Sequence, residues 1–229
     1  MQSIKIFEEL NIDAGFSTRE TTVEIKRRAM AEDCSKNGGM VVRPLLVHGK
    51  RVAVINEITA AYIEIPETDG CITNVPGVTL TSTHGDCLAV YACDKVSGAV
   101  GLCHAGWKGT LSGIAEEMIF AMGREYGSHP ADISCYISPG ISKCCFEVDA
   151  DVRDAFANEV PRTKSFIQKK KNGKYLIDLK GINKQWLTDS GVSDIQVSPL
   201  CTCCRKDLFY SYRRDKDTDR MLAWITCKR

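Results

Sequence analysis

The middle of the chain consists of three strand-like runs followed by a helical pattern, and this succession limits the fold more than any other feature. Residues 78–83, 87–94 and 99–106 are rich in β-branched and small apolar residues, with short turn-like sequences between them. Apolar residues then recur at helical spacing over residues 110–126. Strands joined by short turns pair as neighbours, and a helix covers one face of their sheet. The run therefore predicts a protein that packs α and β elements around a buried sheet.

The remaining segments have the same mixed character, without an internal repeat or a linker rich in proline or serine. We expect a single domain of the α+β class over residues 1–229, with mixed sheets. Further strands are predicted at residues 4–7, 14–17, 40–49, 51–56, 133–140 and 174–179. Further helices are predicted at residues 20–34, 149–159 and 180–190. A loop is predicted at residues 68–77, and a closing hairpin from residues 209–215 and 220–227.

Charge and hydropathy exclude two classes of partner. The chain has 30 basic and 29 acidic side chains, which gives a net charge of +1. Its densest basic run, residues 169–174, ends in a turn sequence and is predicted to be a solvated hairpin tip. We therefore expect no nucleic-acid partner. The first ten residues lack a signal-peptide pattern, and no apolar run reaches the roughly 20 residues of a membrane span, so we expect a cytoplasmic protein without a membrane partner.

Cysteine is abundant, with twelve residues that lie mostly in apolar, strand-like contexts. Without an export signal, such cysteines are expected to be reduced thiols of a cytosolic protein. Two segments are denser, Cys144-Cys145 and the group Cys201, Cys203 and Cys204. We expect no second metal site in them.

Three residues at the ends of strand-like runs are of the types that bind metals. His48, Cys87 and His104 each lie beside glycine or another small residue. Two imidazoles and one thiolate suit zinc, and three protein ligands are typical of a catalytic site, in which Asp86 would orient a ligand or transfer a proton. The residue types leave two alternatives open. One is a pair of core histidines near a buried thiol; the other is a hydrolase with Cys87 as nucleophile, His104 as base and Asp86 as its orienting group.

Candidate anion-binding residues also stand out. Gly106 and Gly109 bracket Lys108 just before the predicted helix, so backbone amides and a cation share one turn. A tight turn that serves only packing is the alternative. Arg213 and Arg214 are adjacent in a predicted strand, where their side chains would point to opposite faces. At most one of the two would then enter a given site.

Several blocks of the sequence resemble the laccase-domain family, first described as multicopper polyphenol oxidases and later as purine nucleoside phosphorylases. The N-terminal blocks are FSTR at residues 16–19 and VHGK at residues 47–50. The later blocks are GDCLAV, CHAGWKG, SPGISKCCFEV and FYSYRRDKDTDRMLAWI. They occur in the family's order and span nearly the whole chain, so the sequence is identified as a member of that family.

The resemblance implies a four-layer α/β/β/α sandwich and a zinc site formed by His48, Cys87 and His104. It implies phosphorolysis of purine nucleosides such as adenosine and inosine, with adenosine deamination and methylthioadenosine cleavage as companion activities. The expected partners are purine nucleoside and phosphate, and zinc is favoured over copper. Laccase activity needs a larger histidine cluster than this chain's four histidines can build. Besides a copper polyphenol oxidase, the alternative is a Cys/His amide hydrolase that acts on a peptidoglycan precursor.

Phosphate would be bound by Lys108 and by one of Arg213 and Arg214, together with backbone amides near Gly140 and, as a weaker candidate, Arg19.

The predicted catalytic residues are Asp86 and Cys87, with Asp86 relaying protons in deamination. His84 is not one of the family's three ligands, and it is either a neighbour of the metal site or a fourth ligand. The chain departs from the family at Leu46, where a glutamine usually precedes the VHG block. The sequence leaves both a monomer and a homodimer open.

Overall fold

Two six-stranded mixed sheets form the centre of the computed structural model, which describes residues 3–7, 10, 12–20, 22–216 and 218–227. The first sheet contains, in spatial order, β1 (Ser3–Ile6), β2 (Ala14–Ser17), β15 (Met221–Thr226), β7 (Val78–His84), β3 (Met40–Pro44) and β5 (Tyr62–Ile65). The second contains β14 (Asp194–Val197), β10 (Ile133–Ile137), β8 (Leu88–Asp94), β9 (Val100–Ala105), β6 (Gly70–Thr73) and β4 (Val52–Ile55). Parallel pairs occur in both sheets, β3 with β5 and β7 in the first, and β4 with β6 and β10 with β14 in the second.

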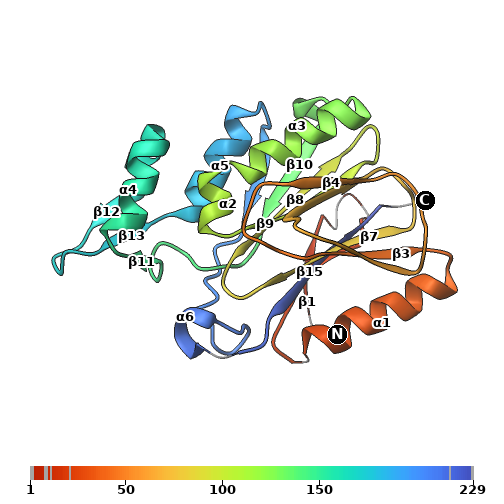
Figure 1. The fold of residues 1–229 in the computed structure, drawn as a ribbon, viewed down its shortest axis with the longest axis horizontal. Coiled ribbons are helices and arrows are strands. Elements are labelled where there is room, and N and C mark those ends of the chain that lie inside the picture. Colours follow the sequence, from red (N-terminus) through yellow and green to blue (C-terminus); the bar gives the residue numbers. More distant parts are fainter. Residues whose placement is uncertain (1–2, 8–9, 11, 21, 217, 228–229) are drawn as a thin grey trace.

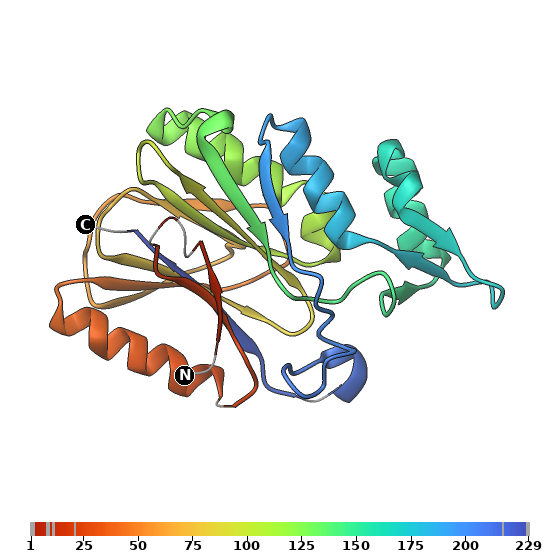
Figure 2. The same ribbon diagram turned by 180° about the vertical axis from the view of Figure 1, so that it is seen from behind.

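Helices cover the outer faces of the sheets, and the inner faces pack against each other (Figures 1 and 2). The longer helices are α1 (Val23–Lys36), α3 (Ile114–Tyr126), α4 (Ala150–Glu159) and α5 (Leu179–Asp189). The short ones that lie wholly within the described residues are α2 (Trp107–Leu111), α6 (Tyr212–Asp215) and the 3₁₀ helices Pro130–Asp132 and Pro161–Phe166. Helix α1 packs on β3 and β15, whereas α3 and α5 pack on the second sheet. None of the helices in the described ranges is long and apolar enough to cross a bilayer.

The sequence of β8 (Leu88–Asp94) does not alternate between apolar and polar residues, and its position in the fold explains why. All seven of its residues are buried. Successive side chains of a strand point to opposite faces, so Leu88 and Val90 enter the core beneath the helices, while Ala89 and Tyr91 enter the core between the two sheets. Because both faces of β8 are covered, its side chains are apolar except for the Tyr91 hydroxyl and the terminal Asp94, both of which are hydrogen-bonded. This strand therefore holds the two cores together.

A small third sheet projects from one end of the molecule together with α4 (Figure 1). It consists of β11 (Glu147–Val148), β13 (Tyr175–Ile177) and β12 (Ile167–Lys169). The turn between β12 and β13 closes with a hydrogen bond from the Lys170 amide to the Lys174 carbonyl oxygen, at 2.8 Å. Gly173 takes the left-handed conformation there, with φ +83°. The predicted hairpin tip at residues 169–174 is thus confirmed.

The α+β class, the mixed sheets and most predicted elements are confirmed, but the loop predicted at residues 68–77 is wrong. Residues Gly70–Thr73 form β6, which is buried throughout and pairs with both β4 and β9. Asn74, Pro76 and Gly77, which are typical of turns, do follow the strand, whereas Gly70 is its first residue. Its four residues are too few to produce a clear period of two. Strands β5 and β14, which the sequence analysis did not identify, are equally short.

Two further predictions are wrong in detail. The predicted closing hairpin does not form, because residues 212–215 make the helical turn α6 and β15 pairs with β2 and β7 instead. Ser211 caps that turn by accepting a hydrogen bond from the Arg214 amide. The helix predicted over residues 110–126 is two helices, α2 and α3, separated by Gly113 with φ +76°. Only glycine adopts that conformation without strain, so the break is built into the sequence.

Candidate metal centre

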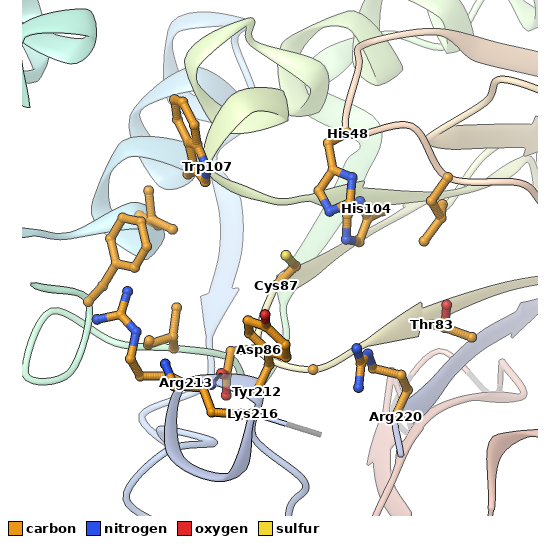
Figure 3. Close-up of a pocket in the computed structure, with 15 residues that line it drawn as sticks. His48, Thr83, Asp86, Cys87, His104, Trp107, Tyr212, Arg213, Lys216 and Arg220 are labelled. Atoms are coloured by element: carbon orange, nitrogen blue, oxygen red, sulfur yellow. Dashed lines mark hydrogen bonds between the residues drawn. The ribbon is translucent and has the colours of Figure 1, made fainter. Parts of the chain in front are cut away.

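The metal-binding side chains predicted from the sequence meet where loops carry the chain from one sheet to the other. His48 lies in the loop between β3 and β4, Cys87 lies in the loop between β7 and β8, and His104 lies near the end of β9. One ligand atom of each lies within 4.8 Å of those of the other two. Figure 3 shows the two imidazole rings above the thiol of Cys87. Two imidazoles and a thiol in this arrangement can bind one metal ion.

Asp69 holds two of these residues in place, and the sequence analysis missed it. Its carboxylate is fully buried and accepts hydrogen bonds from the backbone amides of Val47, His48 and Gly49 at 3.2, 2.9 and 2.8 Å. It also lies 3.1 Å from Nδ1 of His104. His48 has φ +62°, a conformation that is costly for a residue other than glycine. The three hydrogen bonds from backbone amides to Asp69 stabilise this turn and so fix the direction of the His48 ring.

No signal in the sequence pointed to Asp69, since Asp-Gly in a polar stretch is typical of a turn. In the structure Asp69 orients His104, as carboxylates commonly orient the histidine ligands of metal sites. Burial opposes ionisation of Asp69, but hydrogen bonds from His104 and the backbone amides outweigh it, so its pKa lies below the ordinary value. The buried carboxylate is therefore ionised at neutral pH.

The charges of Cys87 and His104 stabilise each other. Burial opposes ionisation of Cys87, but His104 and His48 outweigh it and lower the pKa of the thiol to about 6. Burial also disfavours the charged form of His104, yet Cys87 and Asp69 raise its pKa to about 9. Without a metal, the site at neutral pH is therefore a thiolate beside an imidazolium. A cation bound there would replace the His104 proton while Asp69 keeps its hydrogen bond to Nδ1.

His84 lies next to this group but outside it. Its Nδ1 is 3.2 Å from the carbonyl oxygen of Cys87, and its ring centroid is 5.4 Å from that of His104. Burial and the charge of His104 lower its pKa well below the ordinary value, so it is neutral. Its Nε2 is buried without a hydrogen-bond partner among the described residues. His84 is thus a neutral neighbour of the three ligand residues.

Gly106 leaves the space that the three residues occupy. A Cβ atom at this position would lie 3.1 Å from the Cys87 Sγ, 3.1 Å from the His48 Cδ2 and 3.5 Å from the His104 Cε1. The Cys87 and His48 atoms would have to move by a few tenths of an ångström to admit it, whereas His104 would be in ordinary van der Waals contact. The absence of a side chain at Gly106 therefore matters to the spacing of the metal-binding atoms.

We expect Gly106→Ala to weaken metal binding without unfolding the protein. Displaced ligands cost affinity, and changes that disturb ligand orientation typically cost about 10- to 100-fold. The measurement is a competition titration against a chelator. Gly123→Ala in α3 is the matched control, because the nearest atom to its added Cβ is 3.5 Å away. Equal zinc affinity in the two variants would contradict the packing argument.

A cavity of about 610 Å³ opens directly onto the metal-binding residues. Its walls carry aromatic and cationic side chains in addition to the three ligand residues. The aromatic ones are Trp107, Phe146 and Tyr212, and the cationic ones are Arg213, Lys216 and Arg220 (Figure 3). Cavities of roughly 300–1,000 Å³ with apolar walls and a few polar groups are typical small-molecule sites. The volume and lining suit an aromatic ligand together with an anion.

Two of the other predicted site residues, Asp86 and Arg213, line the cavity. The carboxylate of Asp86 accepts hydrogen bonds from the Thr202 hydroxyl at 2.6 Å and from the Arg213 amide at 2.8 Å. Nη1 of Arg213 donates to the carbonyl oxygens of Cys145 and Glu147, both at 2.9 Å. Asp86 thus ties the loop of the metal site to α6. Within the described ranges, no protein acceptor contacts the remaining guanidinium nitrogens of Arg213, which can therefore bind a ligand.

The other three cations predicted to bind phosphate do not line the cavity. Lys108 lies with its amino group 5.7 Å from the centre of the Trp107 ring. Arg214 donates to the carbonyl oxygens of Thr202, Cys203 and Phe209 and pairs with Asp215. Arg19 donates to the Lys206 carbonyl oxygen. We expected at most one of the two adjacent arginines to enter a given site, and only Arg213 lines the cavity. The two side chains diverge because they lie in a helical turn and not in a strand.

Comparison with known proteins agrees with these features. The profile of a family described as "Multi-copper polyphenol oxidoreductase laccase" matches residues 2–228. The chain is 39% identical to purine nucleoside phosphorylase YlmD of Geobacillus stearothermophilus, over 96% of this chain and 84% of that protein. It is 31% identical to purine nucleoside phosphorylase YfiH of Escherichia coli (strain K12), over 97% of this chain and 88% of that protein.

A solved structure gives the same result for the fold. The crystal structure of Bacillus licheniformis hypothetical protein YfiH superposes with a TM-score of 0.86 at 31% identity, covering 99% of this chain and 96% of that one. Both the sequence profile and the fold thus match over almost the whole length. The chain therefore belongs to the multi-copper polyphenol oxidoreductase laccase family, the laccase-domain family that its sequence blocks resemble.

Proposed function

We propose that this protein is a zinc-dependent purine nucleoside phosphorylase that acts on adenosine and inosine, with methylthioadenosine as a further substrate. The observation that carries the proposal is the His48, Cys87 and His104 group opening onto a cavity with aromatic and cationic walls. The names of the YlmD and YfiH relatives support the same activity. Aromatic side chains suit a purine ring, and cations suit phosphate.

The donor set fits zinc. Two imidazoles and one thiolate are borderline-soft ligands, and three protein ligands are the usual number at a catalytic zinc. His129, the one histidine not yet placed, is exposed and caps a 3₁₀ helix. The described residues therefore do not supply the larger histidine cluster of a multicopper oxidase. When bound, zinc would supply a Lewis acid that activates an oxygen nucleophile or polarises the substrate.

The chain's own residues would bind and orient the two substrates. In phosphorolysis the bond between C1′ and the purine nitrogen breaks, a bond from C1′ to a phosphate oxygen forms, and a proton ends on the base. We assign phosphate to Arg213, with Lys216 and Arg220 as further cations of the same cavity. Tyr212 and Phe146 would bracket the purine. The carbonyl oxygens that accept from Nη1 fix the direction of the Arg213 guanidinium before phosphate arrives.

Adenosine deamination is the proposed side activity of the same centre. Asp86 lines the cavity and is the candidate proton relay. Because both of its oxygens already accept hydrogen bonds, it would also keep the surrounding loops in position.

The test is a phosphate titration at saturating adenosine and inosine, with release of free base as the measured quantity. The protein should release base and ribose 1-phosphate only when phosphate is present. Arg213→Ala should raise the phosphate requirement by about 10- to 100-fold, the loss expected for a hydrogen bond to a charged group. Lys108→Ala is the matched control and should change it little. If the phosphate requirement rises in Lys108→Ala and not in Arg213→Ala, phosphate binds at the Gly106–Gly109 turn and the assignment to Arg213 is rejected.

A Cys/His hydrolase is the second candidate, because the structure contains the necessary chain of groups. Cys87 interacts with His104, whose Nδ1 faces Asp69 at 3.1 Å. The orienting carboxylate is therefore Asp69, whereas the sequence analysis assigned Asp86 to that role. Such an enzyme would cleave the amide bond of a peptidoglycan precursor without metal and would lose activity on thiol alkylation. If removal of metal leaves activity intact and alkylation abolishes it, this function replaces the phosphorylase.

A further inference from the structure

A second group of metal-binding side chains lies outside the cavity. Four cysteines from two loops bring their sulfur atoms within 4.8 Å of one another, and we call them the thiol cluster: Cys144, Cys145, Cys201 and Cys204. Cys201 is buried, and Cys144 and Cys204 are exposed. The first loop connects β10 to β11, and the second connects β14 to α6. The cluster thus joins segments that are far apart in the sequence.

The sulfur positions have the dimensions of a tetrahedral zinc site. The Cys204 Sγ lies 3.7 Å from the Cys144 Sγ and 3.4 Å from the Cys145 Sγ. Ligands at about 2.3 Å from zinc in a tetrahedron are about 3.8 Å apart. A disulfide needs about 2.05 Å between sulfur atoms, so the separations match metal ligands and not a covalent bond.

The surrounding backbone and charges also suit a thiolate at Cys201. The Ser142 amide donates to the Cys201 Sγ at 3.5 Å, a contact that stabilises negative charge on sulfur. The ammonium group of Lys180 lies close enough to interact with Cys201 and Cys144. Its Nζ is held by the carbonyl oxygens of Ser198 and Leu200, at 2.8 and 2.7 Å. Lys180 therefore places one cation beside Cys201 and Cys144.

We propose that the thiol cluster binds a structural zinc ion, distinct from the ion at the cavity. Four thiolates with no open position are typical of structural zinc sites. This proposal reverses the expectation from sequence that the dense cysteine segments hold no metal. Cys201 and Cys204 have the C-x-x-C spacing of zinc-binding loops, a spacing the sequence analysis overlooked. The adjacent pair Cys144-Cys145 supplies the other two ligands, and only the fold brings the two segments together.

The bound ion would fix the two loops that hold the adjacent arginines of α6, of which Arg213 lines the cavity. Arg213 donates to the carbonyl oxygens of Cys145 and Glu147 in the first loop. Arg214 donates to those of Thr202 and Cys203 in the second. A metal cross-link between the loops therefore positions α6, which carries both arginines, relative to the cavity.

The first experiment counts metal. Protein purified under reducing conditions with zinc supplied should contain two zinc ions per chain by elemental analysis. The double variant Cys144→Ser/Cys204→Ser replaces the two exposed thiols and should contain one. Cys203→Ser, in the same loop but outside the cluster, is the matched control and should retain two. His104→Ala should retain the thiol-cluster ion. Full zinc content in the double variant, or no zinc in His104→Ala, would overturn the proposal.

A second measurement uses the unaltered protein and so does not depend on whether a variant folds. With zinc bound, the four cluster thiols should resist alkylation, and removal of zinc by a chelator should expose them together, as followed by mass spectrometry of the peptides. Alkylation at the same rate with and without zinc would contradict a metal site. A disulfide among the four in reduced, zinc-supplied protein would contradict it as well.

The effect on activity rests on the proposed function, whereas the zinc count does not. Cys144→Ser/Cys204→Ser should raise the phosphate requirement several-fold while kcat at saturating phosphate changes less, because Arg213 is misplaced and not removed. If the variant loses one zinc and keeps the wild-type phosphate requirement, the metal site stands and its positioning role is rejected. If the protein shows no phosphorolysis at all, the zinc count still decides the proposal.

Discussion

Replacing His104 with alanine is expected to abolish zinc binding at the cavity and, with it, base release from adenosine and inosine. His104 is one of the three candidate ligands and the one oriented by a buried carboxylate, so its loss would leave an incomplete donor set. Cys87→Ser should have the same effect, since serine keeps the size of the side chain but provides no thiolate. Zinc content and phosphate-dependent base release are the two quantities to measure.

Two other histidines provide matched controls for this prediction. His129→Ala removes an exposed histidine remote from the cavity lining and should leave both quantities unchanged. His84→Ala should retain zinc, because His84 lies beside the three ligands without belonging to them. Retention of the cavity zinc by His104→Ala would reject the assigned site. Loss of that zinc in His84→Ala would make His84 the fourth ligand.

Asp69→Asn is expected to lower zinc affinity at the cavity by about 10- to 100-fold, the usual effect of altering a group that orients a ligand. The amide keeps the volume of the carboxylate but removes its charge and one acceptor. His104 would then lose the partner on Nδ1, and the amides of Val47, His48 and Gly49 would compete for a single oxygen. A chelator competition measures the affinity, and a melting curve measures stability.

Asp94→Asn is the control because Asp94 is a buried carboxylate of similar type. It accepts hydrogen bonds from the amides of Val96 and Ser97 at 2.8 and 3.2 Å and from the Ser97 hydroxyl at 2.6 Å, in the turn between β8 and β9. Both variants should melt at a lower temperature, since each weakens a buried turn. Only Asp69→Asn should lose zinc affinity. Equal zinc affinities would show that Asp69 supports the turn and not the metal site.

The elements that local sequence identified are those with a strong period or a clear stop signal. Helix α3 ends at Gly127 in the left-handed conformation, and α1 begins after Thr22, whose side chain accepts from the Ile25 amide. The apolar run at residues 87–94 predicted a strand, and the structure shows that this strand, β8, is buried on both faces. Such features depend on neighbouring residues alone, so they can be predicted without the fold.

The arrangement of the cavity and of the residues around it depends on contacts between residues that are far apart in the sequence. Asp69 is 35 positions from His104, and its neighbouring glycine suggested only a turn. Arg213 was predicted in a strand, yet the cap supplied by Ser211 bends the chain into a helical turn that places this arginine, and not Arg214, on the cavity. Lys108 was predicted to bind phosphate because it lies in a glycine-bracketed turn, but its side chain lies outside the cavity lining.

The residue types of the metal centre, two imidazoles and a thiol beside small residues at strand ends, were readable from the chain. The family resemblance assigned these three residues to one site, because their spacing in the sequence could not show that they lie together. Their convergence is a property of the two packed sheets, whose connecting loops cross at the same place. The thiol cluster has the same origin, with two ligands from each of two loops some 60 residues apart. Local sequence selects side chains and turns, whereas only long-range strand pairing brings chemically matched side chains within bonding distance.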